Sequence, residues 1–365
     1  MIIDSLEIQF FKNYDSLKVH FAPGINLIVG HNGAGKTNLL DALHCLAFTK
    51  SAFFNVDGQN IKHDAHYFMV KGHFSNESFA EILCYLEKNQ KKIVKHDQQE
   101  YEKITDHIGK IPLIISTPYD TDLIRDSSET RRKWVDGCIS QLDHDYLMLL
   151  LKYQRTLKQR NSLLKQINGH INNNVASLLD TYDTQIVEWS QEIGARRKEF
   201  VNEFSPHFEQ NLKSIVDRSE AHGLDYQTKT LGENFAQLFR DHLQKDLIMQ
   251  RTHVGCHKDD FTFTLDGKPL KKFGSQGQQK SFLIALRLGQ YDYLKTKKEK
   301  TPLLLLDDVF DKLDDDRIIR IIELIKDAER FGQVFITDAR KERSEKYFVD
   351  TPNSAIFEVE EGNIK

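Results

Sequence analysis

Gly30-His31-Asn32-Gly33-Ala34-Gly35-Lys36-Thr37 fills every fixed position of the phosphate-binding loop pattern G-x-x-x-x-G-K-[ST]. Before it, the branched apolar run 25–29 predicts a buried strand, and after it leucine and alanine recur at helical spacing from Leu39 to Leu46. The loop therefore lies between a strand and a helix, which is the context its mechanism requires.

Each part of such a loop has its own task toward a nucleotide. The glycines let backbone N–H groups surround the β-phosphate, Lys36 reaches the β- and γ-oxygens, and the Thr37 hydroxyl is a ligand for Mg²⁺. The N-terminus of the following helix adds a partial positive charge. We expect the nucleotide to contact Gly30, His31, Asn32, Gly33, Ala34, Gly35, Lys36, Thr37 and Asn38.

A second motif narrows the chemistry to an ATPase. The run 302–306 predicts a buried strand that ends in Asp307-Asp308, which is typical of a Walker B strand. In that motif Asp307 holds Mg²⁺, directly or through water, and Asp308 orients or deprotonates the attacking water. The sequence thus predicts ATP and Mg²⁺ as cofactors, Thr37 and Asp307 as metal ligands, and Asp308 and Lys36 as catalytic residues.

Ser275 followed by Gln278 forms a capping-box pattern, which predicts that a helix begins here. A helix N-terminus with free N–H groups and a hydroxyl is also a possible anion site.

The composition of the sequence limits the classes of protein to which it can belong. A chain of 365 residues with 39% hydrophobic content is globular, and four cysteines far apart, with no C-x-x-C pair, predict neither a disulfide framework nor a zinc site. The formal net charge of −4 means that any nucleic acid must be bound by local basic patches. The chain shows no signal peptide and no long apolar run, so we expect a soluble, cytoplasmic protein that makes no membrane contact.

The middle of the chain differs from its ends. From about residue 121 to 245 glycine and proline nearly vanish, which predicts long helices at 142–164 and 176–204 with a loop at 168–174. Short strands are expected on either side, at 2–10, 17–21, 67–74, 81–86, 111–116, 260–265 and 332–337. The expected fold class is α/β, a P-loop ATPase with an inserted, mainly helical lobe.

The order of the motifs G-H-N-G-A-G-K-T-N, S-Q-G-Q-Q-K and L-L-L-L-D-D-V-F-D-K-L-D resembles the ABC-type ATPase heads of DNA repair, and specifically the RecF family. Nearly the whole chain is covered, including family-typical stretches at 118–136, 153–164 and 255–260. The resemblance implies a discontinuous ABC-type ATPase head at 1–117 and 246–365, with helical lobe II inserted at 118–245.

The resemblance also implies roles for further residues. Ser275, Gly277 and Gln278 resemble the ABC signature, which contacts the γ-phosphate held by a partner subunit, and Asp314 resembles the D-loop acid at that interface. ATP would then be sandwiched between two heads of an ATP-dependent homodimer. Lys12 and Asn13 match positions at which related heads approach the base or ribose.

The function that the resemblance implies is that of an ATP-dependent recombination mediator. Such a protein binds gapped, double-stranded or single-stranded DNA and, with RecR and RecO, helps RecA to load during repair and replication restart. The basic clusters at 131–133, 152–160 and 196–198 are the candidate DNA contacts. Among them we single out Arg131, Arg132, Lys152 and Arg155.

Some positions depart from the family pattern. Phe53 stands near the usual position of an arginine, Cys256 where proline is common, and Asp311 where the D-loop often has serine. Ile336 is followed by Thr337-Asp338 and not by a switch histidine, and no Q-loop glutamine is evident. The residue that positions the attacking water therefore stays open, and slow ATP hydrolysis is expected.

Three alternative classes fit less well. A transport ATPase subunit should carry L-S-G-G-Q and a switch histidine. A nuclease-linked relative needs a metal-binding acidic domain after the ATPase, for which too few residues follow Asp314. An SMC-like structural ATPase head would be interrupted by hundreds of heptad residues, and the helical insertion here is far too short.

Overall fold

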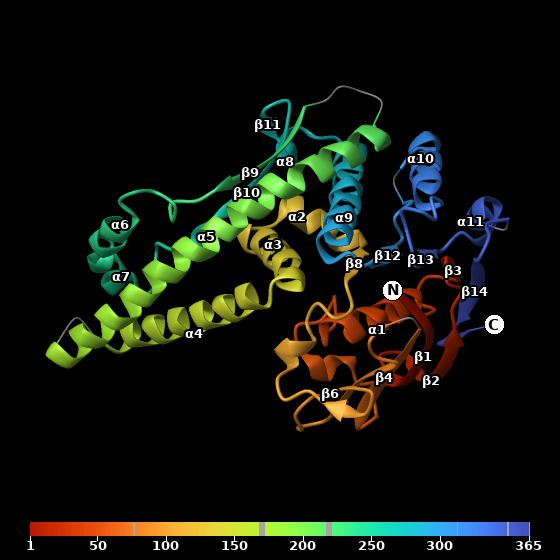
Figure 1. Cartoon of the computed structure of the whole chain (residues 1–365), viewed down its shortest axis with the longest axis horizontal. Coiled ribbons are helices and arrows are strands. Elements are labelled where there is room, and N and C mark those ends of the chain that lie inside the picture. Colours follow the sequence, from red (N-terminus) through yellow and green to blue (C-terminus); the bar gives the residue numbers. More distant parts are fainter. Residues whose placement is uncertain (76, 168–171, 217–220, 312, 349, 365) are drawn as a thin grey trace. The chain divides into compact units, whose positions relative to one another are not determined.

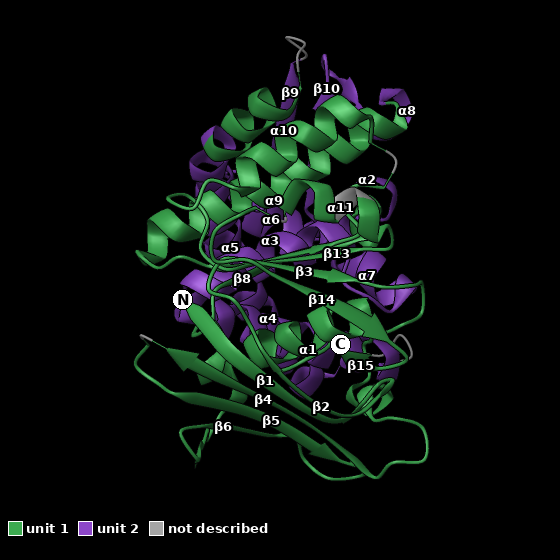
Figure 2. Cartoon of the chain, turned by 90° about the vertical axis from the view of Figure 1, so that its right-hand side faces the viewer, with its two compact units in different colours: residues 1–121, 207–218, 275–365 green, residues 122–206, 219–274 purple. Residues whose placement is uncertain are grey.

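The computed structural model describes residues 1–75, 77–167, 172–216, 221–311, 313–348 and 350–364 (Figure 1). The chain divides into two compact units, of which unit 1 holds residues 1–121, 207–218 and 275–365 and unit 2 holds 122–206 and 219–274 (Figure 2). This division differs from the expected boundaries at 118 and 245. Residues 246–274 belong to unit 2, because the strand at 260–265 pairs with a strand of that unit.

One sheet of unit 1 is built on parallel strands. Its order is β15-β14-β3-β13-β12-β8, and all pairs except β15·β14 are parallel. Every residue of β3, β12 and β13 is buried, which explains why these strands are nearly continuous apolar runs. The bounds are β3 Ile25–Val29, β8 Leu113–Ser116, β12 Leu303–Asp307, β13 Val334–Asp338, β14 Ala355–Glu360 and β15 Asn363–Ile364.

The second sheet of unit 1 is antiparallel, with the order β2-β1-β4-β5-β6-β7. Burial alternates along β4 and β5, so one face packs on the core and the other faces outward. The bounds are β1 Ile2–Phe11, β2 Tyr14–His20, β4 Tyr67–Ser75, β5 Glu81–Glu87, β6 Ile93–His96 and β7 Gln99–Glu100. The strands predicted from the N-terminal alternation are therefore confirmed.

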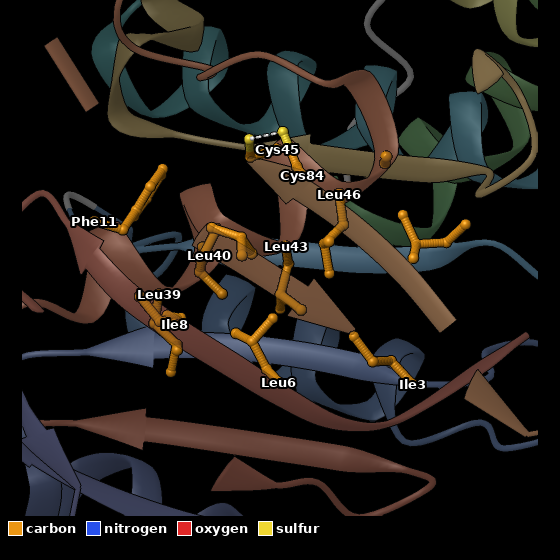
Figure 3. Close-up of a cluster of buried hydrophobic side chains, with 14 of the residues drawn as sticks. Ile3, Leu6, Ile8, Phe11, Leu39, Leu40, Leu43, Cys45, Leu46 and Cys84 are labelled. Carbon is orange, nitrogen blue, oxygen red and sulfur yellow. Dashed lines mark hydrogen bonds between the residues drawn. The ribbon is translucent and has the colours of Figure 1, made fainter. Parts of the chain in front are cut away.

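Helix α1, Lys36–Phe48, contacts strands of both sheets and is buried on nearly all sides. Its leucines pack against Ile3, Leu6, Ile8 and Phe11 of β1, as Figure 3 shows. On the same helix Cys45 lies with its sulfur 3.6 Å from that of Cys84 on β5, and all four cysteines are buried and free. The helix also buries Asp41 and His44, which find polar partners in Lys12 and the Lys50 carbonyl, and its buried position fixes the loop that precedes it.

Further helices complete unit 1. They are α9 Gln276–Lys298, α10 Asp315–Ile325 and α11 Lys341–Phe348, with 3₁₀ turns η1 Asp57–Asn60, η2 Ile104–His107 and η3 Pro118–Asp120. The Arg287 guanidinium of α9 makes a bidentate pair with Asp120, at 2.9 and 2.7 Å. This pair ties α9 to the turn that follows β8.

Unit 2 is mainly helical and carries a small sheet of order β11-β10-β9. Its elements are α2 Thr121–Arg125, α3 Ser128–Leu142, α4 His144–Gln166, α5 Asn173–Ile215, β9 His222–Gln227, α6 Phe235–Asp241, α7 Leu243–Met249, η4 Cys256–Lys258, β10 Asp260–Leu265, β11 Lys268–Pro269 and α8 Leu270–Phe273; the end of α5 belongs to unit 1. In the described part of the chain, no helix is both long enough and apolar enough to cross a bilayer.

The two predicted long helices exist as α4 and α5, although α5 continues past the expected end at residue 204 and has Pro206 inside it. The expected loop at 168–174 lies partly outside the described residues. The strand β9 at 222–227 was not predicted within the mainly helical lobe. It forms by antiparallel pairing with β10, a strand more than 30 residues further along the chain.

Two buried arginines hold unit 2 together. Arg197 donates to both carboxylate oxygens of Asp136 at 2.9 Å and to Asp259 at 3.2 Å, while Tyr146 donates to Asp136 at 2.6 Å. Arg160, which is fully buried, pairs with Asp183 and Asp246. The family-typical stretches around these residues therefore supply ion pairs of the interior.

We predict that Arg197→Ala destabilises unit 2 by about 3–5 kcal/mol, because it leaves the Asp136 carboxylate buried and unpaired. Both tryptophans, Trp134 and Trp189, belong to unit 2, so urea unfolding followed by tryptophan fluorescence reports on this unit alone. Lys198→Ala is the control, because this neighbouring side chain is exposed and its loss should cost less than about 0.5 kcal/mol. Equal urea midpoints for the two variants would contradict the assignment.

Candidate nucleotide-binding site

The predicted loop and the predicted acids meet at one edge of the parallel sheet. β13 lies between β3 and β12, with Val29 opposite Asp338 and Asp307 opposite Thr337. Because parallel strands end at the same edge, residues far apart in sequence come together there. The structure thus places the loop beside Asp307 and Asp308, as the sequence predicted.

The loop is held by close backbone approaches. Gly30 has φ 153°, and a Cβ at this position would lie 2.3 Å from the carbonyl oxygen of Val359 in β14. The carbonyl oxygen of Ala34 accepts from the Asn13 side chain at 3.1 Å and from the Gly362 N–H at 3.0 Å. Only glycine fits at position 30, and the loop is braced from two sides before any ligand arrives.

The Lys36 ammonium caps its own loop. Its Nζ donates to the carbonyl oxygens of Gly30 at 2.8 Å and His31 at 3.1 Å, and the side chain is buried. Carbonyl oxygens are weaker partners for an ammonium than phosphate oxygens are. The Lys36 ammonium therefore already lies at the loop, where it could bind a nucleotide phosphate.

Thr37, Asp307 and Thr337 form a compact oxygen cluster. The Thr37 Oγ1 lies 3.0 Å from each carboxylate oxygen of Asp307, and the Thr337 hydroxyl donates to Asp307 at 2.6 Å. Burial raises the pKa of the Asp307 carboxyl, and these two hydroxyls and Lys36 oppose that rise. Hydroxyl and carboxylate oxygens are the donors that Mg²⁺ prefers, so Thr37 and Asp307 suit such an ion when phosphates and water complete its shell.

Asp308 adopts an unusual backbone conformation. Its φ is 48°, in the left-handed region, and its N–H donates to the Thr337 hydroxyl at 3.0 Å. Burial raises the pKa of its carboxyl, and the charges of Asp338 and Asp311 raise it further, whereas Lys36 lowers it. A strained acid with a raised pKa is typical of a functional site.

Of the two candidate residues in the turn between β1 and β2, only Asn13 contacts the phosphate-binding loop. Asn13 bridges the loop, because it donates to Ala34 and accepts from the Asn38 side chain at 2.7 Å. Lys12 instead forms an ion pair with buried Asp41 and lies over the Phe53 and Phe54 rings, at 5.0 and 4.6 Å. This geometry corrects the expectation for Lys12, whose charge is taken up inside the protein. Asn13 remains well placed.

The signature residues begin helix α9 as expected. Ser275 and Gln278 form the predicted capping box, with distances of 2.8 and 3.2 Å, and Ser275 is exposed. Asp314 caps α10 by accepting the N–H of Arg317 at 3.0 Å. Both predicted interface segments are therefore the starts of helices in unit 1.

Among the candidate DNA contacts, Arg131 and Arg132 are engaged within unit 2. Arg131 pairs with Asp260 through two bonds of 2.8 and 3.1 Å, and Arg132 donates to the Asp259 carbonyl at 2.6 Å and the Ser128 hydroxyl at 2.7 Å. The expectation that they are surface cations available to DNA is corrected on this ground. By contrast, Lys152 and Arg155 on α4 are exposed.

Sequence reasoning missed two residues that organise the site. Thr337 bonds to Asp307 and Asp308, and the Tyr14 hydroxyl donates to the Gly35 carbonyl at 3.0 Å. The hydroxyl at the end of the strand expected at 332–337 was the available signal for Thr337. No local pattern indicated Tyr14.

Comparison with known proteins agrees with this geometry. Residues 1–264 match the model of the AAA ATPase domain family. The chain is 42% identical to the DNA replication and repair protein RecF of Cytophaga hutchinsonii, over 100% of this chain and 97% of that one. The chain belongs to the RecF family. The RecF protein of Flavobacterium johnsoniae is 43% identical over 94% of this chain and 96% of its own.

Solved structures confirm the ABC-type α/β fold of this RecF-family chain. A structure of the recombination mediator protein RecF with ATP, of the RecFOR pathway, matches with a TM-score of 0.89 at 28% identity over 100% of this chain and 97% of that one. An SMC head bound to the C-terminal winged-helix domain of ScpA matches with a TM-score of 0.57 at 17% identity, which shows a shared fold alone.

We predict that Asp308→Asn stabilises the ligand-free protein at neutral pH. A carboxyl whose pKa is higher in the folded state binds more protons there, so the free energy of unfolding falls as pH rises from the ordinary carboxyl value, near 4, through the folded value. Asparagine does not titrate in this range. The melting temperature of the variant should exceed that of the wild type at pH 7.5, and the gap should narrow toward pH 4.

The matched control is Asp180→Asn, which neutralises an exposed carboxylate on α5. It should show no comparable pH-dependent gap. A constant difference between Asp308→Asn and wild type across this pH range would contradict the raised pKa.

Proposed function

We propose that this RecF-family chain is an ATP-dependent, DNA-binding recombination mediator that dimerises on ATP and hydrolyses it slowly. The observation that carries the proposal is the contact of the loop residue Thr37 with Asp307, joined by Thr337, beside the Lys36 ammonium. These groups lie together in unit 1 and would supply contacts to the phosphates and oxygen ligands to a metal ion. ATP and Mg²⁺ are the ligands that this set of donors suits.

In the proposed mechanism the protein supplies position and charge. Lys36 would exchange its carbonyl partners for β- and γ-phosphate oxygens, and Thr37 with Asp307 would hold Mg²⁺, which would neutralise charge on the phosphates. Asp308, fixed by its N–H bond to Thr337, orients the attacking water and accepts its proton. Thr337-Asp338 follows Ile336 near the end of β13, where transporters have a switch histidine, which supports slow turnover.

Dimerisation follows from the exposed start of α9. Ser275, Gly277 and the free N–H groups of this helix would grip the γ-phosphate of a nucleotide bound to a second copy. Because ADP lacks that phosphate, only ATP should join two copies. Asp314, at the start of α10, would face the same interface.

DNA binding is assigned to exposed cations of α4. Lys152 and Arg155 are three residues apart and therefore lie on one face of the helix. A dimer would present two copies of this pair, which gathers positive charge locally on a protein whose net charge is −4 per chain. We propose gapped or junction DNA as the target and RecR and RecO as partners in RecA loading. Support for the partners comes from the solved relative of the RecFOR pathway.

The ATP site is tested by two substitutions with different expected results. Lys36→Met should abolish tight ATP binding, because the ammonium that neutralises the phosphates is removed. Asp308→Asn should retain ATP binding, slow hydrolysis by at least about a hundredfold, and trap the ATP-bound dimer. Fluorescent-nucleotide titration, phosphate release and size-exclusion chromatography measure the three quantities. If wild type elutes identically with ATP, with ADP and without nucleotide, the ATP-driven dimer is wrong.

DNA binding is tested by charge reversal. Lys152→Glu with Arg155→Glu should weaken duplex binding and reduce the slope of log affinity against log salt by about two, roughly one for each phosphate that is no longer neutralised. ATP affinity should not change. Lys229→Glu with Lys245→Glu makes the same change in charge at exposed positions of unit 2 and should leave the slope unaltered. Failure of the ATP-bound wild type to retain gapped DNA at low salt would remove direct DNA binding from the proposal.

A further inference from the structure

Arg317 of α10 lies against the start of α9. A Cβ at Gly277 would lie only 2.5 Å from the Nη1 atom of Arg317, and the same nitrogen lies 3.3 Å from a carboxylate oxygen of Asp314. Asp314 in turn accepts the backbone N–H of Arg317 at 3.0 Å. One guanidinium nitrogen thus stands between the signature helix and the D-loop acid.

Glycine at position 277 leaves room for this contact. Gly277 lies in the first turn of α9, where any residue adopts helical dihedral angles, so backbone conformation does not require glycine there. Glycine in a helix costs roughly 0.5–1 kcal/mol relative to alanine. The space that its missing side chain leaves is occupied by the Arg317 guanidinium.

The two helix starts differ in charge. Asp314, Asp315 and Asp316 lie at the start of α10, whereas the first turn of α9 carries no acid and presents the partial positive charge of its N-terminus. Arg317 pairs with Asp314, and its side chain is 28% exposed. Its positive charge therefore offsets these carboxylates beside the start of α9, where the γ-phosphate of an ATP held by a second copy would approach.

We infer that Arg317 is a positioning residue of the composite ATP site. Seated against Gly277 and paired with Asp314, it fixes the starts of α9 and α10 relative to each other, so that signature and D-loop meet the second copy's nucleotide as one unit. The inference rests on the proposed ATP-dependent dimer and adds a residue that motif reasoning did not assign. Its effect falls on the dimer and leaves ATP binding at the chain's own loop unchanged.

The test is a double-mutant cycle on ATP-driven dimerisation, measured by analytical ultracentrifugation. Arg317→Ala should weaken the ATP-bound dimer about tenfold or more, equivalent to roughly 1.4 kcal/mol, and Arg317→Lys should recover part of the affinity. Gly277→Ala should weaken the dimer to a similar degree by displacing the guanidinium. The effects of the two single changes should be less than additive in the double variant, because both remove the contact between Arg317 and Gly277.

Two further measurements distinguish a failure of the Arg317 inference from a failure of the proposed ATP-driven dimer. ATP affinity of the monomer should be equal in all variants, and the lower kcat of a variant should recover when the protein concentration is raised enough to restore the dimer. Lys326→Ala, at the other end of α10, is the control for removal of a positive charge. Additive effects in the double variant, or a normal dimer in Arg317→Ala, would overturn the role of Arg317. A wild type that fails to dimerise on ATP would overturn the proposed function as well.

Discussion

The candidate site depends on the burial of one carboxylate, that of Asp307, at the edge of the parallel sheet. Asp307 ends a strand that is buried throughout, and burial raises the pKa of its carboxyl. Hydroxyls from Thr37 and Thr337 stabilise it in the absence of a cation, and each comes from a different segment of the chain. A divalent cation bound beside these oxygens would stabilise the carboxylate further.

The rest of unit 1 keeps this edge in place. Helix α1 contacts strands of both sheets, so the phosphate-binding loop ends at a rigid element. Asn13, Tyr14 and Gly362 bond to carbonyl groups of the loop and add a second support on its outer side. A loop held in this way needs little rearrangement on binding, which favours affinity because less conformational entropy is lost. Arg317 links the starts of α9 and α10 in the same way, and these starts belong to the surface proposed to contact a second copy.

Unit 2 uses its charges differently. Arg160 and Arg197 are buried among carboxylates, and Arg131 is paired with Asp260, so three cations of the predicted basic clusters form ion pairs within the protein. The surface cations that remain on α4 are few. A chain with net charge −4 therefore concentrates its proposed DNA contacts, and a second copy of the same face would matter for affinity.

The sequence alone determined the features whose chemistry depends on short spacing. The phosphate loop, the Walker B strand, the capping box at Ser275 and the long helices each depend on neighbours a few residues away, and the structure shows each of them. The α/β fold class followed from their order. The boundaries of the two units did not, because β9 and β10 join only through long-range pairing.

Only the tertiary structure decided which charged groups are available to ligands. Lys12 forms an ion pair with Asp41, and Arg131 meets Asp260, a residue 129 positions away. Lys152 and Arg155 remain exposed although their sequence surroundings are equally basic. Nor did any pattern predict that Arg317 would occupy the space beside Gly277. The physical reason is that the partner of a cation is selected by packing in three dimensions, whereas sequence spacing determines only the local backbone.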